Sequence, residues 1–220
     1  MTRPRSFDLI VFDWDGTLFD STALIARCIQ AACADVSTTV PSDRDASFVI
    51  GMGLAEALRH AAPELPAERY GELADRYRHH YFARQHEVLL FDGTLAMLQA
   101  LKARQHWLGV ATGKSRRGLD EALNSLQLKG LFDATRTADE TTSKPHPQML
   151  LELMSEFDVA PERTLMIGDT THDLQLAATA GAASIGVSYG AHDGAEFAGF
   201  APRHIAHSTL ELHDWLMQHG

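Results

Sequence analysis

The stretch VFDWDGTLFDS, residues 11–21, decides the fold of this chain. It starts inside an apolar, β-prone run, Phe7–Phe12, which is typical of a buried strand. Two carboxylates, Asp13 and Asp15, follow that run at once. Open α/β sheets bind ligands in the crevice outside the carboxyl ends of their strands. The stretch therefore predicts a central strand that ends in a charged site.

Further apolar runs and helical patterns alternate along the rest of the chain. The predicted strands are Trp107–Ala111, Thr164–Ile167 and Ala183–Val187. The predicted helices are Thr94–Ala103, Arg116–Leu126, Gln148–Phe157, Asp173–Ala180 and a last helix that opens at Ser208 with Glu211 in capping-box spacing. This alternation predicts an α/β fold, a doubly wound parallel sheet with helices on both faces.

Residues 22–87 break that rhythm. They are rich in Ala, Leu, Arg and His at helical spacing, contain no strand candidate, and are interrupted at Pro41, Pro63 and Pro66. We expect a helical cap domain at 21–87, inserted into an α/β core made of 1–20 and 88–220. Residues 21–87 are called the helical insertion below. Its place in the sequence puts it above the carboxyl end of the first strand.

Composition limits the classes of partner. The chain has 220 residues, 45% of them hydrophobic, and a formal net charge of −10, which disfavours nucleic acid and anionic membrane surfaces. No apolar run is long enough to span a bilayer, and no secretory core follows the basic N-terminus, so we expect a cytoplasmic protein. The two cysteines, Cys28 and Cys33, fit neither a disulfide framework nor a zinc site. The sequence does not indicate an oligomeric state.

Four segments with polar or charged side chains are expected to meet at one edge of the sheet. Besides the first acid pair they are Thr112-Gly113, Lys144-Pro145 and the run from Gly168 to Asp173. Carboxylate oxygens suit a hard cation such as Mg²⁺, whereas a hydroxyl, backbone N–H groups and an ammonium suit phosphate oxygens. The sequence therefore predicts a site for a metal and a phosphate.

These residues, in this order, resemble the haloacid dehalogenase superfamily, and in particular its phosphatases with a helical cap, such as phosphoglycolate phosphatases. The resemblance covers nearly the whole chain. Its motifs match Asp13-Trp14-Asp15-Gly16-Thr17, then Thr112, then Lys144, then Gly168-Asp169 through Asp173. The fold implied is the Rossmann-like core of that superfamily.

The resemblance implies phosphoryl transfer through the enzyme. Asp13 would attack phosphorus, and Asp15 would protonate the leaving alcohol and then activate water. Mg²⁺ would be held by Asp13, the backbone carbonyl of Asp15 and Asp169. Two further residues would have supporting roles, Asp173 and Thr17, and the phosphoryl oxygens would be bound by Thr112, Gly113 and Lys144.

Other functions stay open at this point. A dehalogenase lacks the acid at the position of Asp15, which favours a phosphatase, and Thr17 favours hydrolysis over the related sugar phosphomutases. A pyrophosphatase of the same superfamily is also compatible. Outside it, a receiver-like phospho-acceptor domain uses Asp, Thr and Lys at the ends of a parallel sheet, but it does not need the helical insertion.

The substrate is less defined than the chemistry. The best candidate for a substrate-facing segment is Ile50, Gly51 and Met52, although a simple turn between two helices explains the glycines equally well. The segment matches only part of the corresponding loop in phosphoglycolate phosphatases. We expect a small phosphorylated metabolite, with 2-phosphoglycolate ahead of sugar phosphates, nucleoside monophosphates and pyrophosphate. His172 lies inside the fourth motif, and its role is left open.

Overall fold

The strand that the opening stretch predicts lies at the centre of a parallel sheet. The computed structural model describes residues 6–125, 128 and 130–220. The sheet has six strands in the order β3-β2-β1-β4-β5-β6, and each neighbouring pair is parallel. The strands are β1 (Leu9–Phe12), β2 (Trp107–Thr112), β3 (Ala134–Thr137), β4 (Thr164–Gly168), β5 (Ala183–Val187) and β6 (His204–Ala206). The predicted α/β fold class is confirmed.

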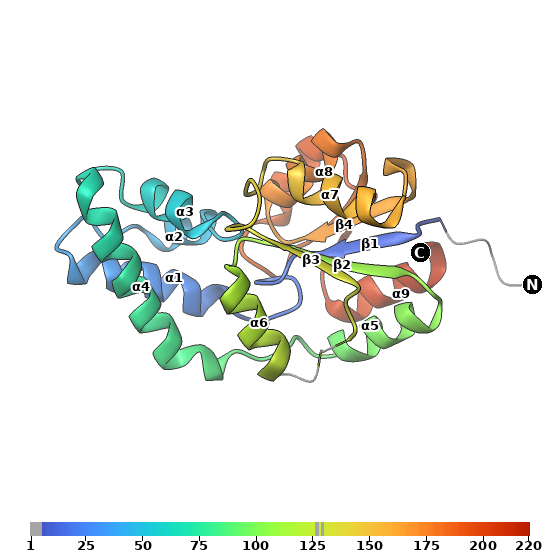
Figure 1. Cartoon of the computed structure of the whole chain (residues 1–220), viewed down its shortest axis with the longest axis horizontal. Coiled ribbons are helices and arrows are strands. Elements are labelled where there is room, and N and C mark those ends of the chain that lie inside the picture. Colours follow the sequence, from blue (N-terminus) through green and yellow to red (C-terminus); the bar gives the residue numbers. More distant parts are fainter. Residues whose placement is uncertain (1–5, 126–127, 129) are drawn as a thin grey trace, which may run out of the picture.

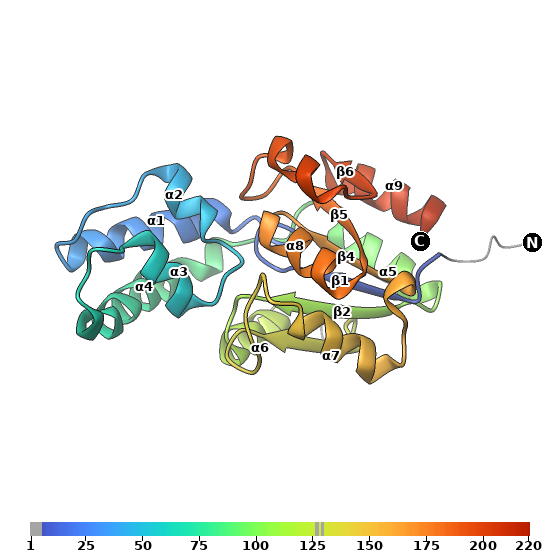
Figure 2. The same ribbon diagram turned by 90° about the horizontal axis from the view of Figure 1, so that it is seen from above.

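Helices cover both faces of this sheet. In Figures 1 and 2, α7 (Gln148–Phe157) and α8 (Thr171–Ala180) lie on one face, and α5 (Thr94–Ala103) and α9 (Thr209–His219) lie on the other. Helix α6 (Arg116–Ser125) packs beside β3. The chain order places β2 and β3 on one side of β1 and β4 to β6 on the other. Ligand crevices form at such a reversal of strand order.

Side chains of β1 point alternately to the two faces of the sheet, so this one strand contributes to two apolar clusters. Ile10 and Phe12 join an apolar cluster with side chains of α5 and α9, whereas Leu9 and Val11 join a second cluster with side chains of α7 and α8. Because successive side chains of a strand point to opposite faces, a strand covered on both faces is apolar throughout. This is why Leu9–Phe12 contains no polar residue.

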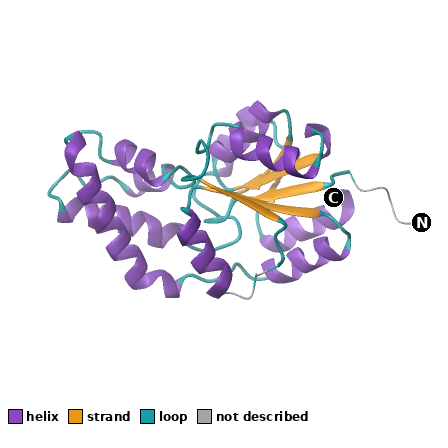
Figure 3. Ribbon diagram, in the orientation of Figure 1, coloured by secondary structure: helices purple, strands orange, loops and turns teal. Residues whose placement is uncertain are grey.

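The helical insertion forms a third apolar cluster of its own. It contains α1 (Thr22–Asp35), α2 (Asp43–Phe48), α3 (Leu54–Ala61) and α4 (Tyr70–Arg84). These helices lie at the carboxyl-end side of the sheet, away from the N-terminus (Figures 1 and 3). Among the residues described, no helix is both long enough and apolar enough to cross a bilayer.

Two strands were not predicted from the sequence. β3 and β6 have only four and three residues, and they include Arg136 and His204. Edge strands are partly exposed and need no continuous apolar run, so they lack the signal that identified the buried strands.

Among the predicted elements, α8 begins at Thr171 rather than Asp173, and β1 begins at Leu9 rather than Phe7. The predicted last residue of α6, Leu126, lies outside the described residues.

Candidate active site

The first predicted site residue, Asp13, directly follows β1 and is 1% exposed. Its backbone N–H donates to the carbonyl of Ile167 at 2.8 Å, which continues the pairing of β1 with β4. On the other side Phe12 pairs with Val110, so Asp13 and Thr112 both lie within two residues beyond that pair. The structure therefore brings the first and second motifs together at the carboxyl end of neighbouring strands.

Lys144 links the first and fourth motifs. Its Nζ atom lies 2.6 Å from Asp13 Oδ1 and 2.6 Å from Asp173 Oδ1, and its side chain is fully buried. Burial alone would lower the pKa of Lys144, but the two carboxylates outweigh burial and raise it, so the ammonium stays charged. Removal of the ammonium would leave both buried carboxylates without their charged partner, which is costly.

Asp173 has a second set of contacts in addition to Lys144. Its Oδ2 accepts from the backbone N–H of Thr170 at 3.2 Å and from the Thr170 hydroxyl at 2.7 Å. An acid in the first turn of a helix is favoured there by unpaired backbone N–H groups. Asp173 therefore both closes the start of α8 and holds Lys144.

Asp169 is fixed by two donors and by the close approach of a turn. The Thr17 hydroxyl donates to Asp169 Oδ1 at 2.9 Å, and the backbone N–H of Ala191 donates to Oδ2 at 2.7 Å. Gly16, at φ +82°, lies so near that a Cβ atom on it would be 2.0 Å from Asp169 Oδ2. Only glycine fits between the first turn and this carboxylate.

Three buried carboxylates, Asp13, Asp169 and Asp173, have oxygens within 4.8 Å of one another. Among the residues that the structure describes, one ammonium, that of Lys144, pairs with this group, so these four side chains are together negative when all three acids are ionised. Asp13 Oδ2 is buried and accepts no hydrogen bond from any residue that the structure describes. Clustered carboxylate oxygens with excess negative charge fit a hard divalent cation such as Mg²⁺.

Crowding of these acids changes their protonation. Burial, followed by the charge of Asp173, raises the pKa of Asp169 to about 7, although the two donors to Asp169 oppose the shift. Burial also raises the pKa of Asp13, with Lys144 as the main opposing group. A divalent cation bound among them would favour the ionised forms.

The predicted phosphate-binding residues meet the predicted cap segment. Thr112 is 1% exposed at the end of β2 and accepts from the backbone N–H of Lys114 at 3.2 Å. A Cβ atom on Gly113 would lie 2.3 Å from the carbonyl oxygen of Met52 and 2.7 Å from that of Gly51. The helical insertion thus touches the backbone that follows β2. The side chain of Ile50, in contrast, is buried in the apolar cluster of the insertion.

Asp15 has neighbours that sequence reasoning missed. Its Oδ1 accepts from the Ser21 hydroxyl at 2.7 Å, and its Oδ2 lies 3.0 Å from Lys114 Nζ. Lys114 Nζ also donates to the Tyr81 hydroxyl at 3.0 Å, from helix α4 of the insertion. The only sequence signal for Lys114 is its place two residues after Thr112, and Tyr81 has no local signal at all.

His172, whose role the sequence left open, is a contact between core and insertion. Its Nε2 donates to the carbonyl oxygen of Phe48 at 2.9 Å, and His192 Nε2 lies 3.0 Å from the same oxygen. The backbone N–H of Thr171 donates to His192 Nδ1, which fixes the proton of His192 on Nε2. Two imidazoles of the core therefore bind one carbonyl at the end of α2.

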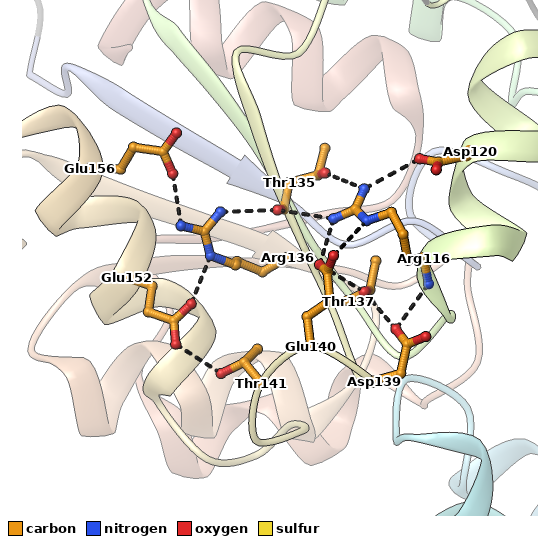
Figure 4. Close-up of polar contacts among 10 residues, drawn as sticks. All are labelled: Arg116, Asp120, Thr135, Arg136, Thr137, Asp139, Glu140, Thr141, Glu152 and Glu156. Atoms are coloured by element: carbon orange, nitrogen blue, oxygen red, sulfur yellow. Dashed lines mark hydrogen bonds and ion pairs between the residues drawn. The ribbon is translucent and has the colours of Figure 1, made fainter.

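A charged network supports the loop that carries Lys144 (Figure 4). Arg116, at the start of α6, contacts both carboxylate oxygens of Glu140 at 2.9 and 2.6 Å, and its backbone N–H donates to Asp139 at 2.9 Å. Arg136 of β3 binds Glu152 and Glu156 of α7, each at 2.7 Å. The network joins the segments that follow β2 and β3, and these segments carry the second and third motifs.

The Arg116–Glu140 pair makes a pH-dependent contribution to stability. Hydrogen bonds from Arg116 lower the pKa of Glu140 to about 2. Because the folded state holds this carboxylate ionised, the contribution is complete above the ordinary pKa of glutamate and is lost as pH falls towards about 2. The side chain is 40% exposed, so we expect Glu140→Gln to lower the free energy of unfolding by up to about 1 kcal/mol at about pH 7.

Urea unfolding of the two proteins at about pH 7 and about pH 3 measures this effect. The difference should shrink at the lower pH. Glu121→Gln is the matched control, because Glu121 pairs at 2.9 Å with Arg117, whose side chain is 82% exposed, and we expect no measurable effect of it. A Glu140→Gln difference that is equal at both pH values would contradict the assigned role of the pair.

Comparison with known proteins shows the family of this chain. Residues 10–187 match the model of the haloacid dehalogenase-like hydrolase family. The chain belongs to this family. It is 32% identical over 210 residues to a probable phosphatase, IndB, of Dickeya dadantii (strain 3937), covering 93% of this chain and 91% of the relative.

Two further relatives extend the comparison. A phosphoglycolate phosphatase of Mannheimia succiniciproducens is 28% identical over 194 residues, covering 84% of this chain and 87% of the relative. A haloacid dehalogenase-like hydrolase of Bacteroides fragilis has a crystal structure that superposes with a TM-score of 0.86 at 26% identity, covering 94% and 99% of the two chains. These findings confirm the predicted family and the predicted enzyme class, a phosphatase.

Proposed function

We propose that this chain is a Mg²⁺-dependent phosphatase that hydrolyses a small phosphate monoester through an aspartyl-phosphate on Asp13. The observation that carries the proposal is the free oxygen of Asp13: Oδ1 is held by Lys144, while Oδ2 is buried without a hydrogen bond from any described residue. An oriented and underused carboxylate oxygen is what a nucleophile requires. The phosphoglycolate phosphatase relative makes 2-phosphoglycolate the first substrate to test.

Each residue has a part in the proposed reaction. Asp13 Oδ2 attacks phosphorus, and the bond to the leaving oxygen breaks on the opposite side. Asp15 gives its proton to that oxygen and later takes one from the water that attacks the aspartyl-phosphate. Lys144, the Thr112 hydroxyl and the Gly113 N–H bind phosphoryl oxygens as their charge grows.

A bound Mg²⁺ would reduce charge repulsion in the proposed reaction. Asp13, Asp169 and the backbone carbonyl of Asp15 would hold Mg²⁺, which would offset the repulsion between carboxylate and phosphate. Asp173 positions Lys144, and Thr17 positions Asp169. The chain's own residues therefore provide the nucleophile, the acid and the orientation.

The helical insertion, residues 21–87, is proposed as a cap that covers the substrate and determines which leaving groups are accepted. Contact of the Gly51 and Met52 carbonyls with Gly113 supports this, since it brings the insertion to the phosphate-binding backbone. We expect Met52→Ala to change the order of preference among substrates more than the rate on a generic activated ester such as p-nitrophenyl phosphate. An unchanged order would remove Met52 from the substrate site.

Phosphate release from a panel of substrates tests the proposed function. The panel contains 2-phosphoglycolate, sugar phosphates, nucleoside monophosphates and pyrophosphate, each with Mg²⁺ or with EDTA. We expect release that requires Mg²⁺ and a clear preference within the panel. Equal release in EDTA would contradict the proposed use of the metal, and conversion between sugar phosphate isomers without release would identify a phosphomutase instead.

A further inference from the structure

A second ammonium, which is mostly but not fully buried, lies beside the proposed general acid. The side chain of Lys114 is 12% exposed, and its Nζ atom lies 3.0 Å from Asp15 Oδ2. The aromatic ring of Tyr81, from α4, lies next to the same ammonium, with its centroid 4.9 Å from Nζ. Lys144 already serves Asp13 and Asp173, so the role of Lys114 is a separate question.

Lys114 and Tyr81 can both donate to an added anion. Lys114 Nζ has three N–H donors. One faces the Tyr81 hydroxyl and one faces Asp15 Oδ2, each at 3.0 Å, so a third is left for an added anion. Tyr81 accepts a hydrogen bond from Lys114, which leaves its own hydroxyl proton for another acceptor. Burial raises the pKa of Tyr81, so that proton is retained.

The proposed reaction, on which this inference rests, brings the leaving group to these two residues. In an in-line displacement the leaving oxygen lies opposite Asp13 and within hydrogen-bond distance of Asp15. Asp15 Oδ2 is 3.0 Å from Lys114 Nζ. The leaving oxygen therefore comes within about 6 Å of Lys114, since it lies about 3 Å from the Asp15 carboxyl group.

We propose that Lys114 and Tyr81 form an anion subsite for the leaving group, so that the preferred substrates carry a second negatively charged oxygen two or three bonds from the scissile oxygen. A carboxylate on the adjacent carbon and a second phosphate both meet this condition. Sugar phosphates and simple alkyl phosphates do not. The subsite joins the core to the insertion, because Lys114 follows β2 and Tyr81 belongs to α4.

A matched pair of substrates isolates the charge. 2-Phosphoglycolate and 2-hydroxyethyl phosphate share a two-carbon leaving group, but only the first carries a carboxylate. We define the discrimination as the ratio of their kcat/KM values, measured with saturating Mg²⁺. Lys114→Met slows both reactions, because Lys114 contacts Asp15, but this common effect and the intrinsic difference between the two leaving groups cancel when ratios are compared between variants.

We expect Lys114→Met to lower the discrimination by about 10- to 100-fold, the value of a hydrogen-bonded charge pair removed from a buried site. Tyr81→Phe should lower it by a smaller factor, since it removes a neutral donor only. Lys102→Met is the control: Lys102 pairs with Asp133 at 2.7 Å, and we expect an unchanged ratio. Pyrophosphate against methyl phosphate, run in parallel, distinguishes a phosphate from a carboxylate as the second anion.

Two outcomes would overturn the inference, and they are distinguishable. Hydrolysis of both members of each pair, with the same discrimination in the parent protein and in Lys114→Met, would remove the anion subsite and leave the phosphatase intact. Absence of phosphate release from every substrate in the parent protein would overturn the proposed function together with the subsite.

Discussion

Replacing Asp13 with Asn is expected to lower kcat by at least about 10⁴-fold, the scale of loss seen when a catalytic nucleophile is removed. The amide has nearly the shape of the carboxylate but cannot attack phosphorus. The folded state should persist, because Lys144 keeps Asp173 as a partner at 2.6 Å. Phosphate release with Mg²⁺, together with circular dichroism and thermal unfolding, measures both effects.

Asp20→Asn is the control for Asp13→Asn. Asp20 lies in the same segment, but it is exposed, so the substitution should leave kcat within about twofold. Substantial Mg²⁺-dependent turnover by a folded Asp13→Asn protein would contradict the role of Asp13. Unfolding of that variant would instead indicate that Asp13 is needed for the fold, and Asp13→Glu, which keeps the charge but moves it, would then separate position from charge.

Lys144→Met is expected to have the largest effect on stability. It leaves three buried carboxylates without their ammonium, and removal of one partner from a buried ion pair costs about 3–5 kcal/mol. Turnover should be lost as well, since Lys144 is a proposed phosphate ligand. Urea unfolding in EDTA, compared with the parent protein, measures the change in the free energy of unfolding.

The loss caused by Lys144→Met should depend on pH with a definite sign. Burial raises the pKa of Asp13 and of Asp169, and removal of Lys144 takes away a group that lowers both. The folded variant then binds more protons than the unfolded chain, so its stability falls as pH rises. We expect a larger deficit at about pH 8 than at about pH 5.5.

Lys102→Met is the matched control for this comparison. It removes an ammonium that pairs with Asp133 at 2.7 Å, with both side chains partly exposed. The expected loss is at most about 1 kcal/mol, with little change between the two pH values. A loss of similar size in Lys144→Met and Lys102→Met would contradict the importance of the buried triad.

The buried parts of the fold could be predicted from the sequence, and the edges could not. β1, β2, β4 and β5 appear as apolar runs because both faces of the sheet are covered around them. β3 is four residues long and contains Arg136, whose side chain binds acids of α7, so its sequence reads as polar. Short edge strands depend on neighbours that local sequence does not reveal.

The same distinction applies to the candidate site. Four of the predicted site residues lie at the ends of strands or the starts of helices: Asp13, Lys144, Asp169 and Asp173. The hydrophobic pattern of the sequence is enough to locate these ends and starts. The structure brings these four residues together. Lys114 and Tyr81 were missed because their contact joins residues that are 33 positions apart, across the boundary between core and insertion. No pattern within either segment indicates that contact.

In the proposed reaction the phosphoryl group is transferred to the carboxylate of Asp13. Trapping of this aspartyl-phosphate tests the transfer most directly. The enzyme is mixed with a substrate from the panel and Mg²⁺, quenched in acid within one turnover, and digested for mass spectrometry. We predict a phosphoryl group on Asp13 that is absent in Asp13→Asn and disappears when the reaction is allowed to finish. Rapid turnover without a phosphoryl group on Asp13, or with one on another residue, would contradict the account.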